Sequence, residues 1–161
     1  TALFSKATQN RYRLWTNSKS KIYNYGGSLG LKYRLDQTFT ALTNVTYTKL
    51  DRTDDKDGLE DGFNTPEFNI NGTLMANNIW QNLSASITAH YQNNFNYVSF
   101  LVSGNVPAYW SMDAQVNYNF KKGITAKLGG TNILNKPYTS ILGGPSIGGL
   151  YYLSLVWETK I

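Results

Sequence analysis

Cysteine is absent from the 161-residue sequence, and its absence excludes both a disulfide framework and a cysteine-based metal site. Charged residues are scarce at 16%, yet mean hydropathy is −0.38, because Asn, Ser, Thr, Gln and Gly supply the polarity. No run of about 18 apolar residues occurs, so no membrane-spanning helix is expected. The net charge of +5 is small and dispersed, which argues against a nucleic-acid-binding protein. This composition suits a wet interior and polar turns better than a charged soluble surface.

Catalytic and cofactor motifs are also missing. His90 is the only histidine, and one histidine without a partner nucleophile or a cluster of metal ligands makes no catalytic constellation. The Gly-Gly pair at 129–130 lacks the spacing of a phosphate-binding loop. Asn132 and Asn135, which follow it, instead suit a turn capped by hydrogen bonds from side chain to backbone. We therefore expect no enzyme activity and no cofactor.

One acidic segment is the place to look for a metal. Oxygen-rich loops bind Ca²⁺ when several carboxylates converge, and Asp54, Asp55 and Asp57 are the candidates here. An EF-hand is excluded, because Thr53 occupies its first ligand position and Asn64 its twelfth. A solvated, like-charged surface loop is the expectation, so no metal site is predicted.

The last twelve residues, LYYLSLVWETKI, alternate with period two. One face is apolar with an aromatic residue near each end, and it consists of Tyr151, Leu153, Leu155, Trp157 and Ile161. A soluble sheet rarely leaves such an edge open, because it invites aggregation. A barrel that closes in a lipid membrane needs this pattern, with an apolar outside and a polar inside. We expect the apolar set to be the lipid face of a closing strand.

The same alternation recurs along the chain, and aromatic residues bracket the apolar faces. The sequence has 12 Tyr, 4 Trp and 7 Phe, and amphipathic rings are typical of the girdles at membrane–water interfaces. The strand lengths of roughly 9–13 residues are those a tilted membrane strand needs. We predict about seven strands, at residues 23–35, 39–48, 68–80, 83–91, 110–120, 124–130 and 150–161.

The connections between these strands alternate in length. Tight breaks fall at 36–37, 77–81 and 121–123, and long segments at 50–66, 92–108 and 132–149. Outer-membrane barrels have short periplasmic turns and long extracellular loops. The expected fold is therefore all-β, a membrane antiparallel β-barrel with the tight breaks on the periplasmic side.

Several motifs resemble one family in combination. They are Phe63–Pro66 (FNTP), Pro107–Tyr109 (PAY), Asp113–Val116 (DAQV), Gly129–Tyr138 (GGTNILNKPY) and Gly143–Tyr152 (GGPSIGGLYY). Together they resemble the C-terminal end of TonB-dependent outer-membrane receptors, in particular those typical of Bacteroidota. The resemblance covers roughly residues 20–161.

The resemblance implies a large architecture of which this chain is a part. The family's barrel has about 22 strands around a plug domain, so residues 1–161 would be the C-terminal part of the barrel domain, without the N-terminal plug and the remaining strands. The whole protein would sit in the outer membrane of a Gram-negative bacterium. There it would take up a scarce nutrient, such as a siderophore, a glycan or a peptide.

The implied partners follow from that architecture. They are the remainder of the barrel, the plug, the TonB complex acting through the plug, and outer-membrane lipid or lipopolysaccharide. A surface lipoprotein is a further candidate, and no nucleic acid is expected. Two alternatives stay open, namely a passive porin or structural barrel without a plug, and a soluble β-sandwich binding module.

Two sets of side chains are candidates for function inside and above such a barrel. By parity His90, Asp113 and Gln115 face the lumen, where polar side chains contact water or plug. Phe95, Tyr97 and Phe100 belong to an aromatic-rich outer loop and are candidates for contact with a ligand or a partner.

Overall fold

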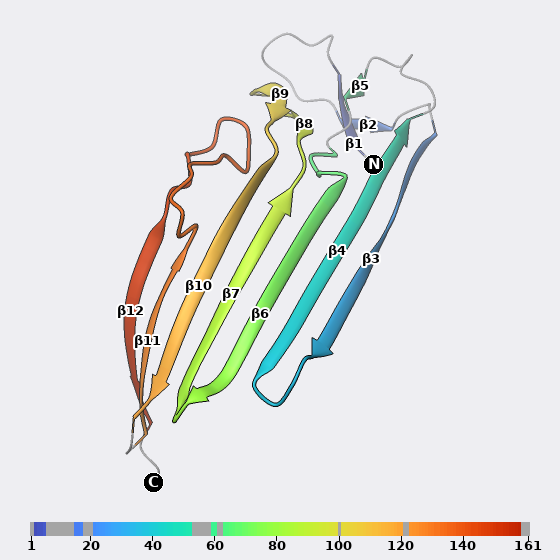
Figure 1. Ribbon diagram of the computed structural model, residues 1–161. Helices are drawn as coiled ribbons and strands as arrows, with labels where there is room; N and C mark the ends of the chain where they lie inside the picture. Colours follow the sequence, from blue (N-terminus) through green and yellow to red (C-terminus); the bar gives the residue numbers. More distant parts are fainter. Residues whose placement is uncertain are drawn as a thin grey trace.

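The main feature of the computed structural model is one antiparallel sheet of seven strands, in the order β12-β11-β10-β7-β6-β4-β3 (Figure 1). The structure describes residues 2–5, 15–17, 21–52, 59–60, 63–99, 101–120 and 123–158. The strands of this sheet are β3 (Ile22–Arg34), β4 (Phe39–Arg52), β6 (Phe68–Trp80), β7 (Leu83–Gln92), β10 (Tyr109–Asn119), β11 (Ile124–Thr131) and β12 (Leu150–Trp157).

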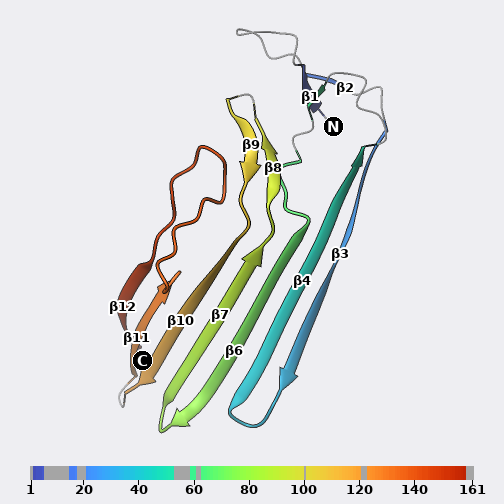
Figure 2. The ribbon, with the colours of Figure 1, turned by 45° about the horizontal axis from the view of Figure 1, so that its top comes forward.

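Two small sheets accompany the main one. A hairpin of β8 (Phe95–Val98) and β9 (Ser103–Val106) extends beyond the ends of β7 and β10 in both ribbon views (Figure 2). The second small sheet consists of β1 (Ala2–Ser5), β2 (Trp15–Asn17) and β5 (Leu59–Glu60). Among the described residues, no helix has the length and hydropathy needed to cross a membrane.

The all-β antiparallel fold predicted from the alternation is confirmed, and all seven expected strands are present. Strands that follow one another within the main sheet are also neighbours in space, so this sheet is a simple meander. β4 is longer than predicted, because its last residues pair with the start of β3 as far as Arg52 with Ile22.

The register sorts side chains onto two different faces. Leu29, Val45, Ile70, Tyr91 and Trp110 are neighbours in one row across five strands. The adjacent row is polar and consists of Gly30, Asn44, Asn71, His90 and Ser111. Because side chains alternate across a strand, the apolar rows share one face of the sheet and the polar rows the other.

The apolar face is open. Leu153, Leu155 and Trp157 of β12 expose 72%, 72% and 73% of their surface, and Leu29 and Leu31 of β3 expose 62% each. Among the described residues, only Ala76 and Val106 are buried hydrophobic residues, so the main sheet encloses no core of its own. An apolar surface of this extent indicates contact with another apolar phase or partner.

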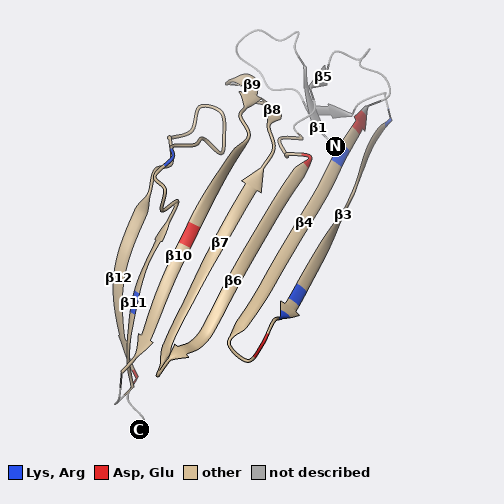
Figure 3. Cartoon of the chain, viewed as in Figure 1, with Lys and Arg blue, Asp and Glu red and all other residues tan. Residues whose placement is uncertain are grey.

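Charged side chains are sparse along the sheet (Figure 3). Asp113 is the only charged residue of β10. Asp36 has a turn role instead, since its Oδ1 accepts hydrogen bonds from the backbone N of Thr38 and Phe39, both at 2.7 Å. This local bonding explains the tight break between β3 and β4.

Two predicted connections need correction. The strand predicted at 68–80 is confirmed as β6, so the tight break expected at 77–81 is confined to Gln81–Asn82, after a register shift between Ala76 and Trp80. Asn78 (φ 52°) absorbs the extra residues, since asparagine adopts the left-handed backbone more readily than most residues. The segment 92–108 is not an irregular loop, because it contains the β8–β9 hairpin.

Candidate functional site

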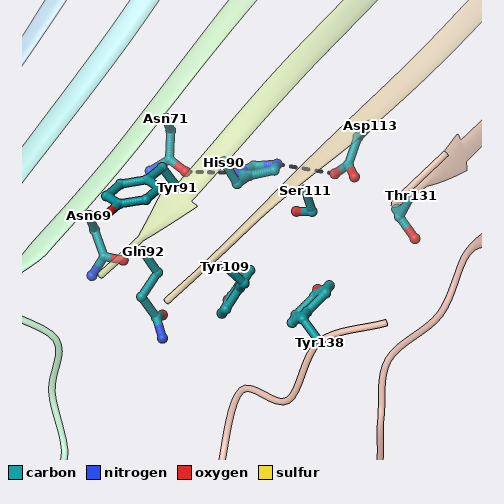
Figure 4. A pocket seen from close by; sticks show the side chains of 10 residues that line it. All are labelled: Asn69, Asn71, His90, Tyr91, Gln92, Tyr109, Ser111, Asp113, Thr131 and Tyr138. Carbon is teal, nitrogen blue, oxygen red and sulfur yellow. Dashed lines mark hydrogen bonds and ion pairs between the residues drawn. The ribbon is translucent and has the colours of Figure 1, made fainter. Parts of the chain in front are cut away.

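A hydrogen-bonded row of side chains crosses three strands on the polar face. Asp113 of β10 accepts a hydrogen bond through Oδ2 from His90 Nε2 of β7, at 3.1 Å. His90 Nδ1 lies 2.7 Å from Asn71 Oδ1 of β6. The side chains of His90 and Asp113 are about one third exposed, 36% and 33%, so this row borders open space on the polar face (Figure 4).

The second carboxylate oxygen of Asp113 holds the connection between β11 and β12. Its Oδ1 accepts a hydrogen bond from the backbone N of Asn132 at 2.9 Å. The Asn132 side chain is buried, 2% exposed, and its Nδ2 donates to the carbonyl oxygens of Lys136 at 2.8 Å and Ile147 at 3.3 Å. Asp113 therefore anchors the start of this connection to the sheet, and the Asn132 side chain bridges from there to Lys136 and Ile147.

The connection is ordered by asparagines, as predicted for Asn132 and Asn135. Both have positive φ, 46° and 49°, and Asn135 Oδ1 accepts a hydrogen bond from the backbone N of Gly149 at 2.8 Å. The expected caps from side chain to backbone are thus confirmed at both positions. Asparagine suits both positions because it adopts the left-handed backbone conformation more readily than most residues, and its short polar side chain can bond to the nearby backbone.

Two aromatic contacts also hold this connection against the sheet. Tyr138 stacks on Tyr109 at the start of β10, with ring centroids 4.0 Å apart and planes 15° from parallel. Lys136 places its Nζ 4.5 Å from the centroid of the Trp110 ring, which lies in an apolar row of the sheet. The connection thus reaches both faces of β10.

The polar face carries a pocket of about 390 Å³ at this place (Figure 4). Its walls come from β6, β7, β10, the end of β11 and Tyr138. They offer amide, hydroxyl, imidazole and phenol groups, from residues that include Asn69, Asn71, His90, Ser111, Tyr109 and Tyr138. Among the described residues that line the pocket, Asp113 is the only acidic one, and none is Lys or Arg.

Gln115 lies on the same face as Asp113, further along β10. Its Nε2 donates to Asn117 Oδ1 at 2.7 Å, and its Oε1 accepts from the Tyr152 hydroxyl of β12 at 2.6 Å. Tyr152 reaches across Gly129, which lies between them in the register and has no side chain. Gln115 therefore bonds to the closing strand rather than to the pocket.

Asn64 is a structural residue whose role the sequence did not predict. Its Nδ2 donates to the carbonyl oxygen of Val98 at 2.8 Å, and its Oδ1 accepts from the backbone N of Val98 at 2.7 Å. The carboxamide thus pairs with β8 as a neighbouring strand would. Asn64 belongs to the FNTP motif, but its partner was hidden because residues 95–106 were interpreted as a loop.

Replacing Asn64 with alanine is expected to loosen the β8–β9 hairpin. Two hydrogen bonds to Val98 would be lost, which costs about 1–3 kcal/mol in total. Hydrogen exchange of peptides covering 95–106 in the whole protein should become faster, whereas exchange in β11 should not change. Asn96→Ala, at an exposed position of the same hairpin, is the control. Equal exchange in both variants would contradict this role of Asn64.

Asp113→Ala is expected to release the connection between β11 and β12. The variant leaves the backbone N of Asn132 without its acceptor, at a cost of about 1–3 kcal/mol. Hydrogen exchange of peptides covering 132–149 should accelerate by roughly tenfold or more. Asn117→Ala, on the same face of β10 but away from the connection, should leave these peptides unchanged. Unaltered exchange in Asp113→Ala would show that the asparagine caps and the aromatic contacts hold the segment without Asp113.

The remaining candidates have different positions. Phe95 and Tyr97 lie in β8, two residues apart and therefore on one face of the hairpin, paired with Val106 and Gly104. Tyr151 is 61% exposed on the apolar face of β12, with Leu153, Leu155 and Trp157.

Four groups of candidates lie outside the described residues, and these are Phe100, Ile161, the acidic Asp54–Asp55 pair and Asp57. In the described ranges, no group of three or more His, Cys, Asp or Glu residues is arranged to hold a metal ion.

Comparison by sequence finds no match, either to a protein family model or to a curated protein. Solved structures do match. The FrpB iron transporter from Neisseria meningitidis has a TM-score of 0.65 at 18% identity, over 96% of this chain and 27% of that one. The copper transporter OprC has a TM-score of 0.65 at 17% identity, over 86% of this chain and 22% of that one.

A third match is FpvA of P. aeruginosa bound to heterologous pyoverdines, with a TM-score of 0.62 at 12% identity, over 83% of this chain and 18% of that one. The chain therefore spans between about a fifth and a quarter of the matched proteins, 18%, 22% and 27% of their lengths. All three are TonB-dependent outer-membrane receptor barrels. The fold of this chain is that of a segment of such a barrel.

Proposed function

We propose that residues 1–161 form the C-terminal wall of a TonB-dependent outer-membrane transporter, which takes up a scarce nutrient in a Gram-negative bacterium. The observation that carries the proposal is the meander of seven strands with one open apolar face and one polar face. In a barrel this arrangement places lipid outside and the aqueous lumen inside. His90, Asp113 and Gln115 then face the lumen, and Tyr151, Leu153, Leu155 and Trp157 face lipid.

The edges of the sheet support the presence of further strands. β3 and β12 are its outermost strands, and each has one strand neighbour among the described residues. An edge strand leaves backbone N–H and C=O groups unpaired, which a membrane does not tolerate. In the proposal the remainder of the barrel pairs with these edges. The plug fills the lumen, connects to the TonB complex and, with the barrel, forms a non-enzymatic transporter.

The experiment uses the full-length protein in planar lipid bilayers and in cells. A plugged transporter is expected to show no stable open conductance, and cellular uptake of its nutrient should stop when the proton-motive force is collapsed or TonB is deleted. A constitutive conductance together with uptake that ignores TonB would instead establish a passive porin. Recovery of the full-length protein in the soluble fraction without detergent would contradict both membrane functions and favour a binding module.

A further inference from the structure

The pocket on the polar face has a chemistry that selects among nutrient classes. It is lined by the Asp113–His90–Asn71 row and by the two rings of the Tyr109–Tyr138 stack (Figure 4). Its volume of about 390 Å³ falls in the range of roughly 300–1,000 Å³ that is usual for small-ligand sites. In the proposed transporter this pocket opens to the lumen, so the inference rests on the proposed function.

The charges of the pocket disfavour an anionic ligand. None of the described residues that line it is Lys or Arg, and Asp113 contributes a carboxylate. Lys136, from the adjacent connection, is engaged over the ring of Trp110, in an apolar row of the sheet. A carboxylate, phosphate or sulfate group entering here would meet Asp113 with no Lys or Arg among the described lining residues to compensate, and recognition of such anions relies mainly on Arg or Lys.

The polar groups of the pocket match hydroxyls. Amides and hydroxyls both donate and accept, and the lining supplies them from Asn69, Ser111 and Thr131. A carboxylate has about four lone-pair sites, and Asp113 uses two of them for Asn132 and His90. The remaining acceptor capacity calls for a donor on the ligand. Sugar hydroxyls meet this need, whereas a ferric hydroxamate complex presents mainly acceptor oxygens.

The aromatic pair adds a flat apolar surface. Tyr109 and Tyr138 stack nearly parallel, and each retains one ring face that the other does not cover. Both rings line the pocket, and both residues are half-buried. The C–H face of a pyranose ring packs well on such a surface, while its hydroxyls point sideways to polar groups.

We propose that this pocket binds a neutral oligosaccharide, whose sugar rings pack on the Tyr109–Tyr138 pair and whose hydroxyls bond to the amide, hydroxyl and carboxylate groups of the floor. Tyr138 comes from the connection that Asp113 and Asn132 hold in place. The Asp113 carboxylate therefore has two roles in the proposal, as an acceptor for the ligand and as a positioning residue for the aromatic pair.

The test measures binding by calorimetry to the full-length receptor purified in detergent. The probes are hexamers of neutral glucan, fructan, xylan and mannan, the hexamer of galacturonate, ferrichrome as a neutral ferric hydroxamate, and a neutral glycine–serine hexapeptide. We expect at least one neutral hexamer to bind. Tyr138→Ala should weaken that binding by about tenfold or more, a loss of ~1.4 kcal/mol. Tyr138→Phe, which keeps the ring, should retain it.

The control is Tyr118→Ala, which removes an aromatic residue from the other face of β10 and should bind like the unaltered receptor. Heat-modifiable gel mobility shows that each variant is folded. Binding of the galacturonate, ferrichrome or the peptide but of no neutral hexamer would overturn the inference, as would the binding of none. Equal loss in Tyr138→Ala and Tyr118→Ala would also overturn it. Because binding in detergent needs neither TonB nor an energy source, its failure is separate from a failure of the transport proposal.

Discussion

Leu153→Arg should strongly reduce the amount of folded protein in the outer membrane. Leu153 is 72% exposed in the middle of β12 and pairs with Leu128 of β11, which is 60% exposed on the same face. In the proposed barrel this position faces lipid near the midplane, where an arginine costs about 2–4 kcal/mol. The measurement is the fraction of full-length protein with heat-modifiable mobility in outer-membrane extracts.

The neighbouring residue supplies the matched control. Ser154→Arg places the same charge one residue further along β12, on the polar face with Lys127, and should leave the folded fraction nearly unchanged. Trp157→Asp should lower the yield less than Leu153→Arg, because Trp157 lies near the end of the strand and Asp costs less than Arg on a lipid face. Equal losses for Leu153→Arg and Ser154→Arg would refute the assignment of the two faces.

Gly130→Ala is expected to destabilise the pairing of β11 with β12. A Cβ at Gly130 would lie 2.9 Å from the carbonyl oxygen of Leu150 and 2.8 Å from Cδ1 of Tyr151. The backbone oxygen cannot move without disturbing the ladder, so we expect a loss of about 1–3 kcal/mol, as in other overpacked sites. The midpoint of urea unfolding of the full-length protein, refolded in lipid, measures this loss.

Gly72→Ala provides the comparison for this glycine. Gly72 lies on the apolar face of β6, and a Cβ there would meet nothing within 4 Å. Alanine reduces the freedom of the unfolded chain, so this variant should be neutral or slightly stabilising. If Gly130→Ala were as stable as Gly72→Ala, the close approach of Tyr151 to β11 would not be a determinant of the closing hairpin.

The strands of the main sheet were predictable because each has to separate an apolar from a polar face. Apolar and polar residues therefore alternate along segments such as 83–91 and 150–157. The register between neighbouring strands is also restricted, because a slip by one residue would exchange the two faces. The β8–β9 hairpin was missed because each of its strands has only four residues. One face carries Phe95, Tyr97 and Val106, but the other mixes Val98 with Asn96, Asn105 and Ser103, so the alternation is too short and too incomplete to mark a strand.

The candidate site was only partly predictable. Parity assigns His90 and Asp113 to one face, and the structure places them there. Their hydrogen bond depends on the register between β7 and β10, in which Asp113 pairs with Thr88 and His90 with Ser111, and no local pattern contains that information. The caps made by Asn132 and Asn135 were predictable because they are local. The contact of Asn132 with Asp113, and the stack of Tyr138 on Tyr109, link segments far apart in the chain.

Nitroxide scanning along β12 would show whether this strand separates lipid from an aqueous lumen. Single spin labels at each position from Leu150 to Trp157 of the full-length protein in lipid bilayers report access to oxygen, which concentrates in lipid, and to a water-soluble nickel chelate. We expect strict alternation, with labels at 151, 153, 155 and 157 accessible to oxygen and those at 152, 154 and 156 accessible to the chelate or covered by plug. Labels that are all accessible to the chelate, or an apolar face that neither reagent reaches, would contradict a wall between lipid and lumen.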